Sequence, residues 1–335
     1  MRGSQDDDAY MTRLITRKYS VALCCAVFLI VVLFILQTSV REVAVKPRLF
    51  DLIANESSIA AVEISRGNTR ITMVSTDAGW RISHHEKLKD YPVDPLVMSR
   101  LIRFVLDAKY VERKTDRPEK LGKLGLALEV DQSASVGPVL LSVEAMSKES
   151  QVLVGNLSQS GLGTYVRVPN ESQVWLVSGR VKLPLDVLDW ISPVFLNIDR
   201  AEIVRATFTS PTGARVVVSA SGNTESAIIE NMPVGTKLAY DSVPDTALDA
   251  LINLRLIEVR RADYHAWEDA ASAAFELSSG SLILLRCTEI NGKYWVLVAR
   301  DGITDRWSYA VDQYRFAQLT KEMNDYLAIR QDNGE

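Results

Sequence analysis

An uninterrupted apolar stretch near the N-terminus is the strongest hydrophobic pattern in the chain. It runs from Tyr19 to Leu36, and the 22 residues between Lys18 and Arg41 carry no charge. At a rise of about 1.5 Å per residue, a helix of this length spans the roughly 30 Å hydrocarbon core of a bilayer. The pattern therefore predicts one transmembrane helix over residues 19–40, which contacts the lipid bilayer through Tyr19 to Leu36.

Two other interpretations of this stretch fit less well. A cleaved signal peptide has an apolar region of about 7 to 15 residues followed by a small residue at the cut, for which Ser39 is a candidate. A lipoprotein carries its modified cysteine after the apolar region, whereas Cys24 and Cys25 lie near the start of this one. The length favours an uncleaved anchor, in which the two cysteines are apolar filler.

The cations beside the stretch predict its orientation, because positive charge is retained on the cytoplasmic side. The polar arm of residues 1–18 carries Arg13, Arg17 and Lys18 close to the apolar stretch. We therefore expect a cytoplasmic N-terminus, a linker over residues 41–57, and the bulk of the chain outside the cytoplasm.

Beyond the linker, the pattern changes to short alternating segments. Apolar and polar residues alternate over residues 58–83 with turns near Gly67 and Gly79, which predicts an antiparallel meander. Asp94 and Pro95 then fit the cap and first position of a helix. Further strands are predicted over 139–144, 151–155, 164–168 and 173–177, and short helices over 118–126 and 184–190. This first unit ends near residue 197.

The second half repeats this order about 145 residues later, which indicates a duplication. Strands are predicted over 202–209, 214–220, 273–277, 282–290 and 294–300. Pro244 and Asp245 are predicted to begin a helix with an apolar face of Leu248, Leu251, Ile252 and Leu256, and a final helix over 312–330 to bury Phe316, Leu319, Met323 and Leu327. The expected fold is α+β: one N-terminal transmembrane helix, then two similar units of antiparallel sheet packed with helices, 58–197 and 198–335.

Composition narrows the classes of function. The chain of 335 residues is 47% hydrophobic, so it can form real cores, while its net charge of −4 leaves no basic field for nucleic acid. Outside the apolar stretch Cys287 is the only cysteine, so no disulfide is expected within the extramembrane part.

The residues that could form a metal or nucleotide site lack the further ligands or the strand-to-helix turn that such a site needs. His84 and His85 are adjacent, so on a strand they point to opposite faces, and a metal site would need further ligands. Gly161 and Gly163 do not lead from a strand into a helix, and Ser160 lacks a strand-to-helix elbow. A glycine hairpin explains this stretch better.

Two charged groups also have a simpler interpretation. Asp186 and Asp189 beside Trp190 could form a carboxylate pair in a sugar-binding cleft, but a solvated helical face anchored by Trp190 is favoured. Glu258, Arg260, Arg261 and Asp263 are expected on a solvated strand or loop edge. We therefore predict no catalytic, cofactor-binding or metal-binding residue.

A set of short motifs between residues 59 and 203 resembles a known family. These are VEISRGNTRITMV, GWRI, YPVD, KLGKLGL, VLVGN, TYVRV, QVWLV and PLDVLDWI, with a weaker second pass to about residue 300. Together with the N-terminal anchor they resemble the bacterial family catalogued as domain of unknown function 4340, although KLGKLGL departs from the usual tyrosine-glycine-leucine pattern. Such proteins are single-pass envelope proteins often encoded beside ABC transporter components, and the resemblance brings no catalytic residue with it.

The resemblance implies a non-enzymatic inner-membrane protein with an extracytoplasmic binding or assembly domain, whose partners are subunits of an ABC transporter. Two alternatives stay open. One is an envelope hydrolase of cell-wall polysaccharide or peptide, which needs acids or a nucleophile from distant segments to meet in a pocket. The other is a structural envelope scaffold that binds no transporter.

Overall fold

The computed structural model describes residues 46–85, 87–127, 137–221 and 226–328. The predicted cytoplasmic arm and transmembrane helix lie outside these residues. Within the described ranges, no helix is both long enough and apolar enough to cross a bilayer. Residues Arg48–Glu335 form one compact region that contains both repeat units, and the following description applies to this region.

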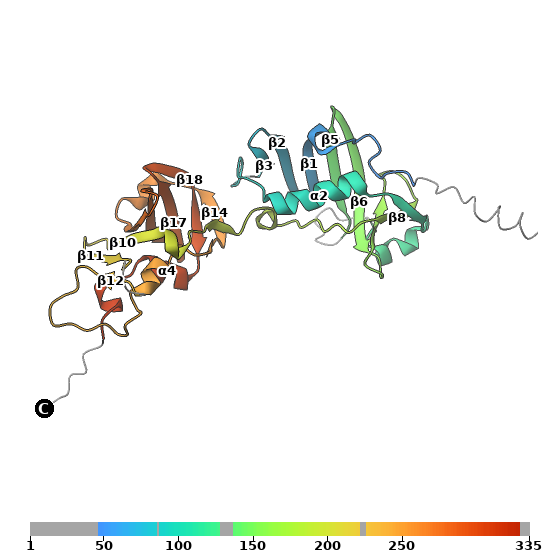
Figure 1. Cartoon of the computed structure of the whole chain (residues 1–335). Helices are drawn as coiled ribbons and strands as arrows, with labels where there is room; N and C mark the ends of the chain where they lie inside the picture. The colour runs from blue at the N-terminus through green and yellow to red at the C-terminus, as the bar shows by residue number, and fades with distance from the viewer. Residues whose placement is uncertain (1–45, 86, 128–136, 222–225, 329–335) are drawn as a thin grey trace, which may run out of the picture. The chain divides into compact units, whose positions relative to one another are not determined.

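The first repeat unit contains an eight-stranded antiparallel sheet (Figure 1). Its strand order is β3-β2-β1-β5-β6-β7-β8-β4. The strands are β1 (Ile59–Arg66), β2 (Thr69–Thr76), β3 (Gly79–His84), β4 (Tyr110–Arg113), β5 (Val139–Ala145), β6 (Lys148–Leu157), β7 (Gly163–Arg167) and β8 (Val174–Ser178).

The second half is another eight-stranded antiparallel sheet with the same connectivity, in the order β12-β11-β10-β15-β16-β17-β18-β14. The strands are β10 (Ile203–Thr209), β11 (Arg215–Ser219), β12 (Ile228–Ile229), β14 (Glu258–Arg261), β15 (Ala271–Leu277), β16 (Leu282–Ile290), β17 (Lys293–Arg300) and β18 (Ile303–Val311). Each strand has a counterpart at the same place in the first sheet, which confirms the predicted repeat.

The repeat extends to an irregularity in the strand pairing. The pairing of β1 with β5 shifts register between Ile59 and Ala61, and the pairing of β10 with β15 shifts between Ile203 and Arg205. A capped 3-10 helix precedes each of these strands: η1 (Glu56–Ser58) and η5 (Arg200–Glu202). Such bulges re-aim the strand that carries them, so both units begin with the same bend.

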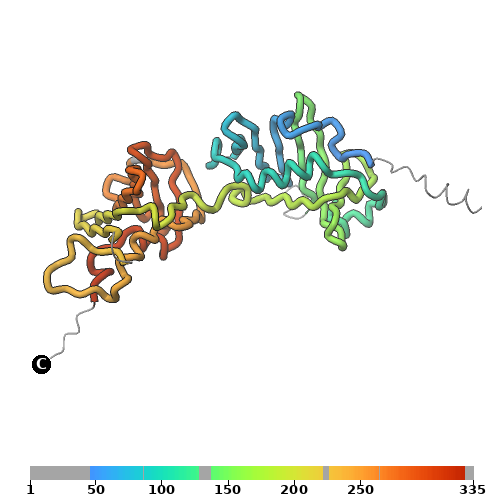
Figure 2. The backbone as a smooth tube through the Cα atoms, viewed as in Figure 1, coloured from blue at the N-terminus to red at the C-terminus, as the bar shows by residue number. Residues whose placement is uncertain are grey.

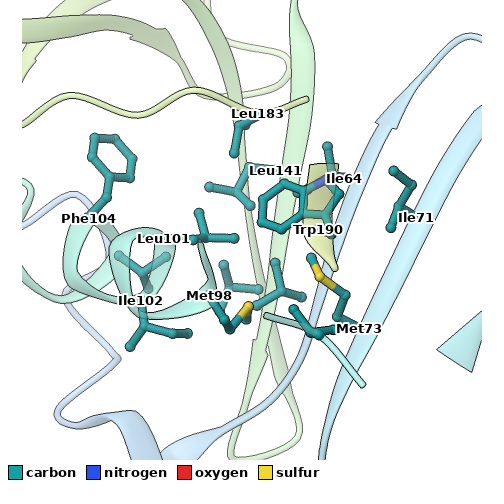
Figure 3. Close-up of a cluster of buried hydrophobic side chains, with 14 of the residues drawn as sticks. Ile64, Ile71, Met73, Met98, Leu101, Ile102, Phe104, Leu141, Leu183 and Trp190 are labelled. Carbon is teal, nitrogen blue, oxygen red and sulfur yellow. The ribbon is translucent and has the colours of Figure 1, made fainter. Parts of the chain in front are cut away.

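Helix α2 (Pro95–Asp107) covers one face of the first sheet (Figure 1). Its start is as predicted, because the Asp94 side chain accepts a hydrogen bond of 2.7 Å from the Leu96 amide and Pro95 takes the first position. Its buried residues meet those of the sheet in one core (Figure 3). They are Met98, Leu101, Ile102, Phe104 and Val105. Burying each such side chain contributes roughly 1.5–3 kcal/mol.

The helix predicted from Pro244 is shorter than expected and ends within one turn. Helix α3 covers Asp245–Leu248 only. Asn253 adopts a left-handed φ of 52°, and the next residues, Leu254–Arg255, form β13, which pairs with β9 (Val194–Leu196). Strand pairing therefore replaces the rest of the predicted helix, and Ile252 is 38% exposed.

The final helix predicted over 312–330 is also wrong in its length. Helix α4 covers Gln313–Leu319 and ends where the Thr320 hydroxyl donates to the Phe316 carbonyl oxygen. A separate 3-10 helix, η7 (Met323–Asp325), follows with a reciprocal cap between Glu322 and Asp325. Because the chain turns between α4 and η7, Tyr326 is completely buried and Leu327 is only half-buried.

Aromatic rings of β18 in the second sheet contact two aromatic residues outside its strands, one before α2 and one on β9. Tyr91 lies edge-on to Trp307 of β18, with 5.0 Å between the ring centroids, and Phe195 stacks on Tyr309 at 4.2 Å. Trp307 and Tyr309 are part of the same buried cluster as the core of the first sheet. Residues 178–200, yellow-green in Figure 2, connect β8 to β10 as a largely extended chain.

Candidate functional site

A cleft of about 570 Å³ lies beside helix α2 in the first unit. Its apolar walls come from Val97 and Leu101 of the helix and from Val181 and Trp190 of the segment that follows β8. Its charged rim comes from Arg100 on the helix and from three residues of that same segment, Arg180, Lys182 and Asp189.

Hydrogen bonds hold the segment after β8 in place against the sheet. The Thr164 hydroxyl donates to the Gly179 carbonyl oxygen at 2.9 Å and accepts from the Val181 amide at 3.3 Å. Farther along, the Trp190 indole nitrogen donates to the Pro184 carbonyl oxygen at 2.9 Å, and the Asp94 amide donates to the Trp190 carbonyl oxygen at 2.8 Å. One wall of the cleft is therefore tied both to β7 and to the start of α2.

The cleft is positively charged. Arg100, Arg180 and Lys182 are exposed, and no described carboxylate lies within ion-pair distance of any of them. Asp189 is the single carboxylate among the lining residues. Cations around an apolar floor suit a ligand that is both acidic and apolar, such as a segment of another protein.

Asp186 and Asp189 do not face this cleft as a pair. The Asp186 side chain accepts a hydrogen bond of 2.9 Å from the Leu188 amide and so caps the 3-10 helix η4 (Val187–Trp190). Trp190 is 1% exposed and belongs to the core of the first sheet. Asp189 alone reaches the cleft.

His84 and His85 lie at the end of β3, beside a shallow hollow lined also by Arg70 and Lys87. The His85 Nδ1 atom accepts a hydrogen bond of 3.4 Å from the Lys87 amide. Cations beside imidazoles repel a metal ion. The described residues contain no group of three or more His, Cys, Asp or Glu side chains placed to hold one.

Gly161 lies in the connection from β6 to β7 and Gly163 is the first residue of β7, as a hairpin interpretation requires. The Ser158 amide donates to the Gly163 carbonyl oxygen and the Gly161 amide to the Ser158 carbonyl oxygen, both at 2.8 Å. The Ser160 hydroxyl lies 3.0 Å from that of Ser158. This geometry is that of a turn.

The charged run at residues 258–263 begins as strand β14, and three of its charged side chains contact residues far away in the sequence. Glu258 forms an ion pair with Lys293, and the Arg260 guanidinium lies 4.0 Å from the centroid of the Trp295 ring. Arg261 forms an ion pair of 3.2 Å with Asp90 in the first unit. These side chains therefore fasten the strand instead of being only solvated.

The motif KLGKLGL begins at the last residue of the 3-10 helix η2 (Pro118–Lys120) and contains the 3-10 helix η3 (Gly122–Leu124). Its leucines pack on the face of the first sheet opposite α2. A Cβ atom at Gly155 of β6 would collide with the Leu124 carbonyl oxygen and lie 2.8 Å from Leu126 Cγ. The neighbouring Asn156 side chain donates to the Lys123 carbonyl oxygen. The glycine in VLVGN is thus a packing requirement of KLGKLGL.

The sequence did not reveal the cleft, because its cations come from segments that are far apart in the chain. Arg180 and Lys182 alternate with apolar residues, a faint signal of an extended segment with one charged side. Arg100 looks like any exposed helical residue. Only the packing of α2 against residues 180–190 brings them together.

Comparison with known proteins gives one match. A family model described as a domain of unknown function (DUF4340) matches residues 80–276, which is more than half of the 335-residue chain. The matched range contains every residue that lines the cleft. Neither a search of curated proteins nor a search of solved structures found a match.

Proposed function

This chain belongs to the DUF4340 family, and from that membership we propose that it is a non-enzymatic, single-pass protein of the bacterial inner membrane and an accessory component of an ABC transporter complex. Residues 19–40 are its anchor in this proposal, and the part after residue 57 lies outside the cytoplasm. The link to a transporter rests on the family resemblance. The structure contributes a surface with which such a partner could be bound.

The observation that carries the proposal is the charge of the cleft. Arg100, Arg180 and Lys182 surround an apolar floor without a described acidic partner. An acidic, partly apolar segment of a transporter subunit would neutralise these cations and cover the floor. Charge complementarity of this kind sets specificity and the rate of association.

The first alternative, an envelope hydrolase, would use a different geometry. A glycosidase places two carboxyl groups about 5–10 Å apart across its substrate. The cleft offers Asp189 together with three cations, which suits binding of an acidic group better than protonation of a leaving group.

The test is affinity purification of the full-length protein from gently solubilised membranes of its host. The wild-type protein should recover transporter subunits, and the triple variant Arg100→Glu, Arg180→Glu, Lys182→Glu should lose them. A control with the same charge change, Lys148→Glu, Lys237→Glu, Arg300→Glu, alters exposed residues that do not line the cleft and should behave as wild type.

Two results contradict the proposal. If the wild-type protein is recovered alone, the proposed interaction with a transporter is wrong, and the second alternative, a structural scaffold, is favoured. Equal recovery with both triple variants shows that the cleft is not the contact.

A further inference from the structure

Arg167 is a buried charge in an apolar row on the outer face of the first sheet, the face opposite helix α2. Its cross-strand neighbours are Leu153 of β6 and Val174 of β8, and Leu140 of β5 extends the row beyond Leu153. Arg167 itself is 9% exposed. Long charged side chains are rarely buried to this extent unless they are paired.

The guanidinium group of Arg167 lacks a strong partner. Its Nη1 atom donates a long hydrogen bond of 3.4 Å to the Glu171 carbonyl oxygen, and its buried Nε has no hydrogen-bond partner among the described residues. No described carboxylate lies within ion-pair distance of it. Burying a charge without a counter-ion is costly, so the described part of the fold does not by itself explain this residue.

The second sheet shows that the fold does not require an arginine here. Arg167 pairs with Leu153 in the first sheet, and at the matching register of the second sheet Leu297 pairs with Arg286. Leu297 is buried in a cluster with Trp267. Arg286 is exposed, and its guanidinium donates a hydrogen bond of 3.3 Å to the Trp267 carbonyl oxygen. The same architecture is therefore built with leucine at the position of Arg167.

A cavity of about 470 Å³ lies next to Arg167. Leu140, Leu153 and Pro169 give it apolar walls, and Gln151 and Ser172 add neutral polar groups. Glu171 also lines it and weakens the attraction for an anion of high charge. The volume lies within the range of small-molecule sites, which combine apolar walls with a few polar groups.

We propose that this cavity binds a carboxylate carried on an apolar stem. Arg167 would supply the charge and the planar fork that matches a carboxylate, while Leu140, Leu153 and Pro169 contact the stem along one side of this open hollow. The carboxylate belongs either to a small organic acid or to the C-terminus of a peptide. This site lies on the opposite face of the sheet from the cationic cleft, so it does not depend on the proposed transporter role.

The test is calorimetric titration of the full-length protein in lipid nanodiscs. The probes are butanoate, its neutral analogue butanamide, inorganic phosphate, and leucine-ending peptides with a free or an amidated C-terminus. Butanoate binding without peptide binding identifies a small-acid site; tighter binding of the free-ended peptide than of its amidated form identifies a peptide-end site. Either result supports the proposal.

Three variants locate the binding. Arg167→Leu, which copies Leu297, should abolish it, and Arg167→Lys should weaken it about tenfold, because the charge stays while the paired hydrogen bonds are lost. Arg286→Leu, at the exposed arginine of the second sheet, should bind as wild type. No carboxylate binding by the wild type, butanamide or phosphate bound as tightly as butanoate, or unchanged binding in Arg167→Leu would each overturn the proposal.

The unfolding midpoint of Arg167→Leu separates a binding role from a structural one. Removing a buried unpaired charge should leave the midpoint equal to that of the wild type or raise it. A large fall would mean that Arg167 holds the sheet together, which contradicts the proposal.

Discussion

The ring of Tyr91 packs edge-on against the ring of Trp307, with an angle of 73° between the ring planes. Tyr91 precedes helix α2 of the first unit, and Trp307 lies on β18 of the second. Arg261 adds to this contact, because its guanidinium lies 5.0 Å from the Trp307 ring centroid and pairs with Asp90. Trp307, like Tyr309 of the same strand, is therefore part of the core of the first sheet.

This contact predicts that the two sheets unfold together. Replacing Trp307 with alanine should cost about 3–5 kcal/mol, as for other large aromatic residues in cores, and should split a single denaturant transition into two. The control is Arg306→Ala, at the exposed neighbouring position on β18, which should change stability by no more than about 0.5 kcal/mol. Tryptophan fluorescence and circular dichroism against denaturant give both values. A single transition at the wild-type midpoint would show that the contact does not couple the sheets.

Gly155 should be intolerant of even a methyl group. Gly155→Ala places a Cβ atom against the Leu124 carbonyl oxygen and Leu126, so we expect a loss of about 1–3 kcal/mol from overpacking. Trypsin should then cleave faster after Lys120 and Lys123. Gly122→Ala is the matched control, because the space around Gly122 is open within 4 Å. Equal cleavage rates for the two variants would contradict this account of the VLVGN motif.

Stability should fall at alkaline pH. Burial raises the pKa of Tyr91 from 10.0 to about 12 and that of Cys287 from 9.0 to about 12, and it also raises the pKa of Tyr309 and Tyr326. In the unfolded chain these groups ionise near their ordinary values, while the folded chain keeps them neutral. Their contribution is therefore complete below about pH 8 for Cys287 and below about pH 9 for the tyrosines, and it is lost as the pH rises towards 12, at up to about 1.4 kcal/mol per pH unit for each group.

The measurement is the free energy of unfolding between pH 7 and pH 11. Tyr326→Phe should flatten the alkaline decline. It should also preserve stability at pH 7, because the buried Tyr326 hydroxyl has no hydrogen-bond partner in the described structure. Cys287→Ala should also flatten the decline, and its effect should begin at a lower pH than that of Tyr326→Phe, because a thiol ionises at a lower pH than a phenol in the unfolded chain. A slope that is the same in both variants and the wild type would show that these groups do not control it.

The local patterns of the sequence predicted the hairpins well. Asn291 and Gly292 both have left-handed φ angles, of 53° and 73°, and join β16 to β17 as their residue types indicate. The meander of β1, β2 and β3 and the capped start of α2 follow from alternation and from Asp94 and Pro95 in the same way. In each case neighbouring residues determine the structure.

Where distant partners determine the structure, the sequence was insufficient. In the sequence, the charged residues of strand β14 look like a solvated run. In the structure they contact residues that are distant in the sequence: Lys293, Trp295 and Asp90. The periodicity after Pro244 is helical, but Leu254 pairs with β9 instead.

The two candidate sites were hidden for the same reason. Arg100 and Arg180 meet only through packing, and the exceptional burial of Arg167 emerges only when the two sheets are compared strand by strand.

Site-specific photo-crosslinking in living cells shows whether the cleft binds a transporter subunit. A photoreactive residue at Leu157, which lines the cleft and is 38% exposed, should form an adduct with a transporter subunit. The same residue at Leu282 of the second sheet, 42% exposed, should not. No adduct from Leu157, or adducts of equal yield from both positions, would contradict the account.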